Sequence, residues 1–335
     1  MPFESTAEPT APPLHAADRG PLVAAVDVGG TKIAGALVDP QGRLLLRALR
    51  PTRADRDAET VMGSVAEVLD ELRAAAEWPR VVAVGIGSAG PIDASRGTVS
   101  PVNIGSWRDY PLVAEVAARV DGLPVVLTGD GMAITAAEHW QGAARGHDNA
   151  LCMVVSTGVG GGLVLGGALH PGPTGNAGHI GHISVDLDGD LCPCGGRGCV
   201  ERLASGPNIV RRAQEAGWLP AAGEAADAAA VARAARAGDA VALASFDRAA
   251  QALAAGIAAT ATLVEIDIAV IGGGVAGSGA LLFDPLRTHL RRYATLSFAA
   301  GVKVVPAVLG TDAGLVGAAA AAGEALGLEA FGAVR

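Results

Sequence analysis

Residues 175–201 concentrate the groups of this chain that can bind a metal ion. The 335-residue sequence contains four cysteines, and three of them fall in the run CPCGGRGC, whose glycines can fold a loop back on itself. Two histidines precede this run by ten to thirteen residues. Three thiolates and one imidazole form the closed tetrahedral set that is typical of structural zinc. We therefore predict a structural Zn2+ site, with buried or redox-active cysteines as the alternative. The candidate ligands are Cys192, Cys194 and Cys199 with either His179 or His182.

The remaining histidine and Glu201 would lie beside this metal and are candidates to contact a ligand. Cys152, the fourth cysteine, lies inside an apolar run and is predicted to be a core residue.

Three glycine-rich segments have the composition of phosphate-binding turns: DVGGTK (27–32), STGVGGG (156–162) and IGGGVA (271–276). Successive backbone N–H groups in such a turn form an anion-binding concavity, and glycine lets the backbone approach the phosphate oxygens. Asp27 adds a carboxylate that can hold Mg2+. We expect two turns at the phosphates of ATP and the third at its adenosine, although a plain hairpin also explains GGTK. The residues predicted to contact ATP are Asp27, Gly29, Gly30, Thr31, Lys32, Thr157, Gly158, Gly160, Gly273 and Gly274.

Two common nucleotide-binding motifs do not fit this sequence. It contains no GxxxxGK[ST] string, so it is not a P-loop protein. The run 85–90 satisfies GxGxxG after an apolar strand, but turn-forming residues follow it instead of the helix that a dinucleotide-binding fold requires. A dinucleotide-binding dehydrogenase is therefore disfavoured.

Apolar runs and helical periodicity predict an α/β protein built from two similar halves. In the first half we expect strands over 22–28, 33–39, 43–49, 81–87 and 124–127, and helices over 58–76 and 132–144. In the second half we expect strands over 150–156, 163–169, 268–276 and 302–308, and helices over 206–216, 225–237, 239–263 and 311–326. VDVGGTKIAGALVD and VSTGVGGGLVLGGAL share one plan, strand, glycine turn and strand, which indicates an internal duplication with a cleft between two lobes.

Composition excludes several classes of protein. A net charge of −9 without long charge runs argues against nucleic acid binding, which needs a basic face. Residues 1–20 lack the basic start and apolar stretch of a signal peptide and are predicted to be a flexible tail. No later apolar run reaches membrane length without glycine, proline or charge, so we expect no membrane contact. Clustered, scarce cysteines disfavour a secreted disulfide framework, and a cytoplasmic location is expected.

Taken together, these segments resemble the ROK family of bacterial sugar kinases, which are glucokinase-like members of the actin-like ATPase superfamily. The resemblance runs from about residue 22 to residue 326. Its most specific part is the string CPCGGRGCVE after GHISVD; GIGSAGPID, PVNIGSWRDYPL and TDAGLVGAA also match.

The resemblance implies a two-lobed actin-like ATPase (ribonuclease H-like) fold, an α/β architecture of mixed sheets with flanking helices and a central cleft. Residues 21–131 plus 318–335 would form the small lobe, and 132–317 the large lobe with the zinc loop. The implied activity is ATP-dependent phosphorylation of a hexose, usually at the 6-hydroxyl. A homodimer, or a homotetramer made from dimers, is also implied.

The resemblance also assigns site residues. Asp130 matches the general base, which must accept the proton of the attacking hydroxyl; helix capping is the alternative role for this aspartate. His182 matches the zinc histidine that also reaches the sugar. The residues implied to bind sugar are Gly90, Asn103, Asp130, His179, His182 and Glu201.

Two positions depart from the family pattern. Gly129-Asp130 stands where the family usually has Asn-Asp, and His179-Ile-Gly181-His182 stands where it has Glu-x-Gly-His. A site built to bind particular hydroxyls rejects analogues that leave its groups unpaired, so a changed set of ligands suggests a changed sugar. Our hypothesis is a modified hexose, an amino sugar such as kanosamine or an N-acylated hexosamine, with glucose still open.

Two alternatives to a kinase are a sugar-sensing regulator and a non-catalytic sugar-binding protein. About twenty residues precede the first predicted strand, which we take as too few for a DNA-binding domain. Gly129 and His179 are the features that favour a non-catalytic binder. Polyphosphate is an alternative phosphoryl donor, but a chain with two lysines, Lys32 and Lys303, does not suggest the basic track it would need.

Overall fold

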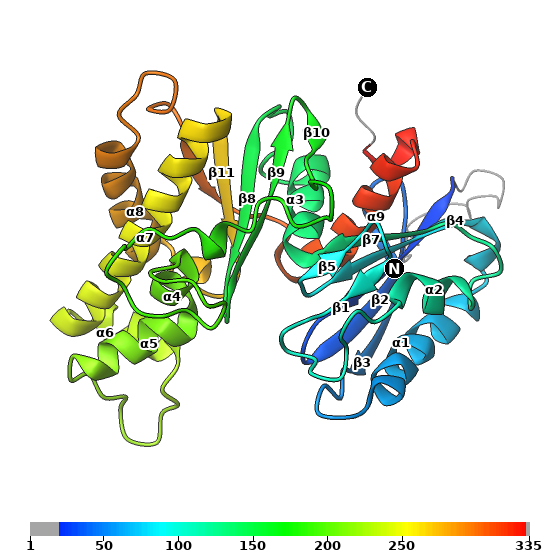
Figure 1. Cartoon of the computed structure of the whole chain (residues 1–335), viewed down its shortest axis with the longest axis horizontal. Helices are drawn as coiled ribbons and strands as arrows, with labels where there is room; N and C mark the ends of the chain where they lie inside the picture. Colours follow the sequence, from blue (N-terminus) through cyan, green and yellow to red (C-terminus); the bar gives the residue numbers. More distant parts are fainter. Residues whose placement is uncertain (1–19, 333–335) are drawn as a thin grey trace, which may run out of the picture.

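Two five-stranded sheets form the centre of the molecule, one in each of two lobes (Figure 1). The computed structural model describes residues 20–332, so the predicted tail falls outside the described residues except for Gly20. The observed mixed α/β architecture confirms the predicted fold class. Within the described residues, no helix is both long enough and apolar enough to span a lipid bilayer.

The first sheet has the strand order β3-β2-β1-β4-β7. Strands β1 to β3 are antiparallel, whereas β1, β4 and β7 are parallel. Alternate residues of β1 face opposite helices: Leu22 and Val26 belong to the core with α1, and Val23 and Ala25 to the core with α9. Both faces are buried, which explains the continuous apolar run. The bounds are β1 Leu22–Val28, β2 Lys32–Val38, β3 Leu44–Pro51, β4 Val81–Ser88, β7 Val125–Gly129, α1 Ala58–Arg73 and α9 Ala313–Ala325.

The second sheet repeats this plan with the order β10-β9-β8-β11-β12. The β8–β9 pair is antiparallel, and β8, β11 and β12 are parallel, so the predicted duplication of strand, turn and strand is confirmed. The bounds are β8 Ala150–Val155, β9 Val159–Leu165, β10 Ala168–Leu169, β11 Ile268–Gly272 and β12 Lys303–Pro306.

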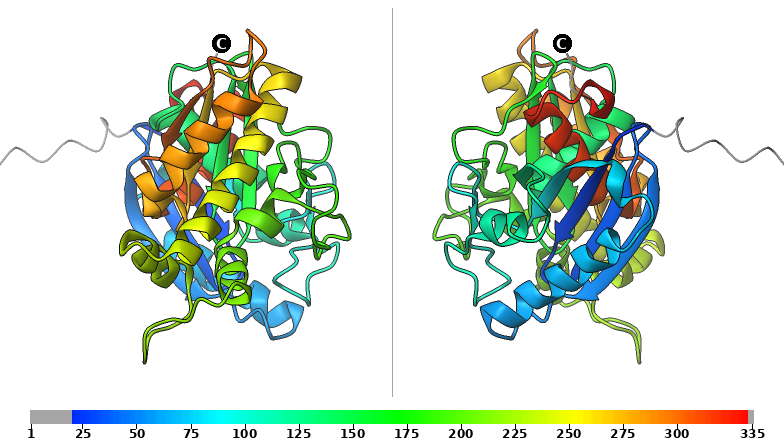
Figure 2. Two further views of the ribbon diagram at one scale, coloured as in Figure 1. Left: turned by 90° about the vertical axis from the view of Figure 1, so that its left-hand side faces the viewer. Right: turned by 90° about the vertical axis from the view of Figure 1, so that its right-hand side faces the viewer.

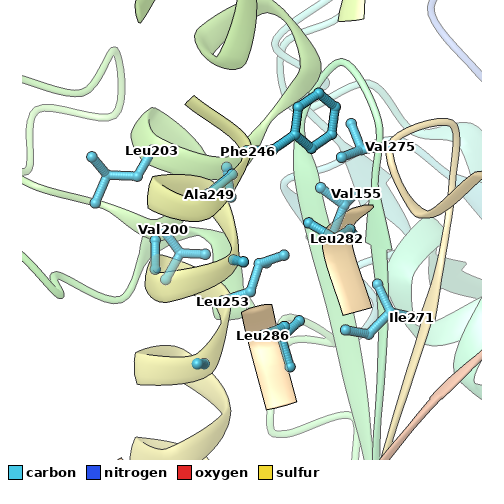
Figure 3. Close-up of a cluster of buried hydrophobic side chains, with 14 of the residues drawn as sticks. Val155, Val200, Leu203, Phe246, Ala249, Leu253, Ile271, Val275, Leu282 and Leu286 are labelled. Atoms are coloured by element: carbon cyan, nitrogen blue, oxygen red, sulfur yellow. The ribbon is translucent and has the colours of Figure 1, made fainter. Parts of the chain in front are cut away.

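Helices α7 and α8 lie on the outer side of this second sheet, and α4, α5 and α6 pack against α7 (Figures 1 and 2). Phe246 and Leu253 of α7 pack with Leu282 and Leu286 of α8 in a hydrophobic core. This core also includes Val155 of β8 (Figure 3). The helices are α4 Val200–Ala204, α5 Gly206–Glu215, α6 Ala228–Arg236, α7 Ala240–Val264 and α8 Ala280–Tyr293.

Helices α3 (Asp130–Gln141) and α9 cross between the two sheets. The crossing is very close, because a Cβ added at Gly317 of α9 would lie 1.6 Å from the carbonyl oxygen of Ala133 in α3. Likewise, a Cβ at Gly131 would lie 2.6 Å from the carbonyl oxygen of Gly161 in β9. The lobes therefore meet through glycine contacts. The predicted boundary between residues 317 and 318 falls inside α9, and the assignment of residues to lobes stays a prediction.

Several short elements complete the chain. The strands β5 and β6 pair as a small antiparallel hairpin after β4. The remaining elements are β5 Ile92–Asp93, β6 Thr98–Val99, α2 Leu112–Ala117, and the 3-10 helices η2 Trp78–Arg80, η3 Ile180–His182, η4 Ala276–Ser278, η5 Gly310–Asp312 and η6 Glu329–Phe331.

The structure corrects three features of the predicted element pattern. Strand β9 begins at Val159, so the glycines that we placed in a turn belong to a strand, where they allow α3 to approach. Strand β11 ends at Gly272, before the end we predicted. Helix α8 was not predicted, because its Pro285 and its arginines obscure the apolar face, and proline usually interrupts a helix.

Candidate functional site

A cavity of about 450 Å3 lies between the lobes and brings together most of the predicted sugar and metal residues. Loops after β4 contribute Gly90 and Asn103, and the start of α3 contributes Asp130. The β8–β9 turn and the cysteine loop (residues 183–199) also contribute to the lining. The predicted residues that line this cavity are Gly90, Asn103, Asp130, Thr157, Gly158, Gly160, His179, His182, Cys194 and Glu201.

The first glycine turn, between β1 and β2, lies at the edge of this cavity and does not line it. A Cβ added at Gly30 would lie 2.3 Å from Nδ2 of Asn103, so a side chain at this position would displace Asn103. The Gly29 amide donates to the Lys32 carbonyl at 3.0 Å. Thr52, which the sequence did not single out, clamps the turn: its hydroxyl donates to the Gly29 carbonyl at 2.6 Å and its amide to the Thr31 carbonyl at 3.1 Å.

The amides of this turn are available to a ligand. Within residues 20–332, the N–H groups of Gly30 and Thr31 have no hydrogen-bond acceptor. Two adjacent free amides form an anion-binding concavity. The arrangement therefore suits a phosphate.

The second turn has the same property. The Ser156 amide donates to the Gly158 carbonyl at 2.8 Å, while the amides of Thr157 and Gly158 have no acceptor in the described part of the chain. Oε2 of Glu201 accepts the Val159 amide at 2.8 Å. A Cβ at Gly158 would lie 2.7 Å from this oxygen. Glu201 is thus attached to the second turn while it lines the cavity.

A second cavity, of about 490 Å3, adjoins the third glycine segment. Thr157 lines both cavities, so the β8–β9 turn lies between them. Gly273 has a φ of +92°, and a Cβ there would lie 2.4 Å from the Val155 carbonyl oxygen, which explains the glycine. Gly274 lines the cavity. The other polar side chains are ones that the sequence did not reveal: Arg211 and Gln214 of α5, and Asp227, which caps α6.

Asp130 is the first residue of α3, and the N-cap is Gly129, so the alternative that Asp130 caps the helix is not what the structure shows. Its Oδ1 accepts the Gly131 amide at 2.7 Å. Burial raises the pKa of Asp130, and the Gly131 hydrogen bond and the charge of His179 oppose this increase. Burial, with a smaller contribution from the charge of Asp130, also raises the pKa of Asp27 to about 6, although Lys32 lowers it.

His179 has a defined orientation. Its Nδ1 lies 3.1 Å from the Asn176 carbonyl oxygen, which can only accept, so Nδ1 carries a proton. In the neutral ring, Nε2 is then an acceptor, and it lies 3.8 Å from the Cβ position of Gly90. Asn176, a residue the sequence did not single out, donates through Nδ2 to the Ile92 carbonyl at 2.7 Å.

The cysteine loop brings four potential ligand atoms together. The side chains of His182, Cys192, Cys194 and Cys199 place these atoms within 4.8 Å of one another. The Cys194 and Cys199 sulfurs are 3.7 Å apart, close to the edge of about 3.8 Å in a tetrahedron with Zn–S bonds of about 2.3 Å. A disulfide requires about 2.05 Å, and all four cysteines of the chain are free thiols. The donor set and its spacing fit tetrahedral zinc.

Known proteins resemble this chain over most of its length. The sequence matches the ROK family over residues 23–325. The glucokinase of Thermotoga maritima is 38% identical over 314 residues, which cover 90% of this chain and 97% of that protein. The N-acetylmannosamine kinase of Escherichia fergusonii is 39% identical over 190 residues, or 57% of this chain and 63% of that protein.

A solved structure shares the fold. The ROK family glucokinase from Streptomyces griseus, in complex with glucose and AMPPNP, superposes with a TM-score of 0.73 at 39% identity. The match covers 90% of this chain and 99% of that chain.

Proposed function

This chain belongs to the ROK family and is an ATP-dependent kinase of a hexose or amino sugar, and from that premise we propose how its residues carry out the reaction. The observation that supports the assignment of roles is the interlobe cavity, where Asp130 shares one space with a glycine turn and the cysteine loop.

Asp130 is the general base. The sugar hydroxyl, usually the 6-hydroxyl in this family, gives its proton to the Asp130 carboxylate as its oxygen forms a bond to the γ-phosphorus of ATP. The bond between that phosphorus and the bridging oxygen breaks, and ADP leaves. Burial supports this role, because a carboxylate with a raised pKa accepts a proton more readily at neutral pH.

The glycine turns hold the triphosphate. The free amides of Gly30, Thr31, Thr157 and Gly158 bind phosphate oxygens from the two lobes, and Lys32 adds a positive charge. Gly160 lines the same cavity, Gly274 lines the cavity that we propose for the nucleoside, and Gly273 precedes Gly274 directly. Asp27 would hold Mg2+, which supplies positive charge to the transferring phosphoryl group. ATP, rather than polyphosphate, is the donor we propose.

His182, Cys192, Cys194 and Cys199 would hold one structural Zn2+. A closed set of four protein ligands leaves no position for a reactive water, so the ion stabilises the loop. The loop then positions Glu201 and His182 against the sugar, with Gly90 and Asn103 on the other lobe.

The pocket favours a modified hexose. Asp130 and Glu201 are carboxylates, and among the described residues no lysine or arginine lines this cavity. Nε2 of His179 offers an acceptor where the family has a carboxylate, and Gly129 offers no side chain. A negative pocket attracts an ammonium group, so we propose an amino sugar such as kanosamine, with an N-acylated hexosamine as the second candidate and glucose still open.

A coupled ADP-release assay tests this proposal. We expect wild-type enzyme with MgATP to phosphorylate at least one amino sugar faster than glucose in a panel of glucose, glucosamine, kanosamine and N-acetylmannosamine. The control, Asp130→Asn, preserves the shape of the base and should lose activity on all of them. A kcat/KM for glucose about tenfold above that of every amino sugar would contradict the proposed substrate class.

Assembly and location complete the proposal. We propose a homodimer, or a tetramer made from dimers, in the cytoplasm, on the basis of the family resemblance. Light scattering coupled to size-exclusion chromatography measures the mass directly, and a monomer would contradict the proposed assembly.

A further inference from the structure

Arg211 of α5 lines the cavity that the proposed function assigns to adenosine, and the inference below rests on that function. Within residues 20–332, no aromatic ring lines this cavity, and Arg211 is the only cationic group in its lining. A purine bound there has no side-chain ring to stack on. The guanidinium is the largest planar group on offer.

The edges of this guanidinium are largely occupied. Nη1 donates to both carboxylate oxygens of Glu215, at 2.7 and 2.9 Å. Nη2 donates to Oδ2 of Asp190 at 2.9 Å, and Nε donates to Oδ1 of Asn208 at 3.4 Å. All guanidinium donors lie in the plane of the group, so these contacts fix that plane. The Arg211 side chain is 29% exposed, so part of the group remains accessible to a ligand.

Apolar groups line another part of this cavity. A Cβ added at Gly206 would lie 3.4 Å from Cβ of Ala228 and 3.6 Å from Cγ2 of Val275, so the backbone and two apolar side chains meet there. Val210, one residue before Arg211, is also part of the lining. These groups can exclude water from a flat apolar ring.

We propose that Arg211 binds the purine ring of the nucleotide by stacking its planar face on it. Arginine stacks on aromatic faces, and the carboxylates at its edges hold it in one plane before the ligand arrives. Two acidic partners also balance its charge, which weakens it as a phosphate-binding cation. Asp190 lies in the cysteine loop, so that loop helps to orient a residue in the nucleoside cavity.

Two probes separate the base from the phosphates: adenosine, which has no phosphate, and inorganic tripolyphosphate, which has no base. Calorimetry on the full chain would measure the Kd of each for wild type, Arg211→Ala and Arg211→Lys. We expect both variants to raise the Kd of adenosine about tenfold and the KM of ATP by a similar factor. Stacking on one base typically changes affinity by about tenfold or more. The Kd of tripolyphosphate, the KM of the sugar and kcat should stay within about twofold, because the glycine turns and Asp130 are untouched.

Arg211→Lys is the informative variant, because it keeps the charge and loses the plane. Wild-type adenosine affinity in Arg211→Lys, or unchanged affinity in Arg211→Ala, would overturn the proposal. A higher Kd of tripolyphosphate in either variant would also overturn the proposal, since Arg211 would then bind phosphate.

Arg202→Lys is the matched control. Arg202 donates to the same Asn208 Oδ1 at 2.8 Å and lies 3.9 Å from Asp190, but it does not line the cavity. The Kd of adenosine for this control should equal that of wild type. An increase in Kd as large as in the Arg211 variants would assign the effect to the hydrogen bonds around Asn208 and Asp190, and would overturn the proposal. Melting temperatures confirm that each variant is folded. Sugar phosphorylation by wild type tests the proposed function separately, because adenosine binding does not require turnover.

Discussion

Asp130 illustrates how the environment of one residue sets its chemistry. An aspartate at the start of a helix is ordinarily ionised and solvated, and the positive end of the helix dipole favours its charged form. Here the carboxylate lines a cavity between lobes, and burial raises its pKa in spite of the Gly131 amide and His179. The group therefore combines a fixed position with a basicity above that of an exposed aspartate, which is what proton transfer from a hydroxyl requires.

The pH profile of kcat/KM tests this environment. The base must be deprotonated, so activity should rise with pH through an acidic limb that lies above the range of an exposed aspartate, about 3.9. His179→Gln removes a histidine whose protonated form lowers the pKa of Asp130, so the limb should move to higher pH. Asp130→Asn should lower kcat by about 10² to 10⁴-fold. A limb that moves to lower pH in His179→Gln would show that the histidine does not act on this carboxylate.

At the scale of elements, the cysteine loop is a segment that turns and the proposed metal site stabilise in place of regular secondary structure. Residues 183–199 contain no helix and no named strand, and they are held by turns such as the Gly195 amide to the Cys192 carbonyl at 2.9 Å. Helix α4 follows directly and carries Glu201 into the interlobe cavity. The position of Glu201, the carboxylate that we propose binds sugar, therefore depends on how well this loop is fixed.

Loss of the metal should therefore raise the KM of the sugar more than the KM of ATP. Cys199→Ser, or treatment with a zinc chelator, is expected to abolish bound zinc, lower Tm and raise the KM of the sugar about tenfold or more, with a smaller effect on the KM of ATP. Elemental analysis and steady-state kinetics measure these changes. Cys152→Ala is the control, because this buried cysteine belongs to a separate core cluster and should leave zinc content at wild type. Full zinc in Cys199→Ser would contradict the ligand assignment.

At the scale of the whole molecule, the two lobes are joined through α3 and α9. α3 packs on β8 and β9 of the second sheet, and α9 packs on the first sheet. At their crossing, Gly317 leaves no room for a side chain beside Ala133. A close contact between two helices at the junction of the lobes suits a joint that must keep its alignment while the cavity admits and releases ligands.

Gly317→Ala should separate these helices. The added methyl group meets the Ala133 carbonyl, so we expect a loss of about 1–3 kcal/mol in the free energy of unfolding together with a lower kcat. Gly63→Ala in α1 is the matched control: nothing lies within 4 Å of its Cβ position, and alanine should stabilise the helix by about 0.5–1 kcal/mol. Denaturant unfolding measures the free energy of unfolding of both variants. Equal changes in the two variants would contradict the role of the α3–α9 crossing.

Local patterns in the sequence determined the type and order of most elements. The apolar run of β1 is continuous because both faces of a mixed sheet are covered, and the heptad-like spacing of Val61, Val65, Val68 and Leu72 gives the buried face of α1. The cysteine spacing indicated a tetrahedral donor set, since thiolates so close along the chain converge with little backbone freedom. Helix α8 was missed because Pro285 obscures a pattern that packing against α7 and β12 overrides.

Only the tertiary structure decided which residues share a space. Asn103, Asp130 and Glu201 are far apart in the sequence and meet because two sheets place their loops on one cavity. Burial raises the pKa of Asp130, whose Oδ1 lies 4.0 Å from the Cβ position of Gly160 in β9, so no local pattern could reveal this shift. The same holds for Arg211 and its ion-pair partner Asp190, which are 21 residues apart in the sequence. Sequence periodicity reports local backbone and burial, whereas a site depends on long-range contacts that only the folded chain creates.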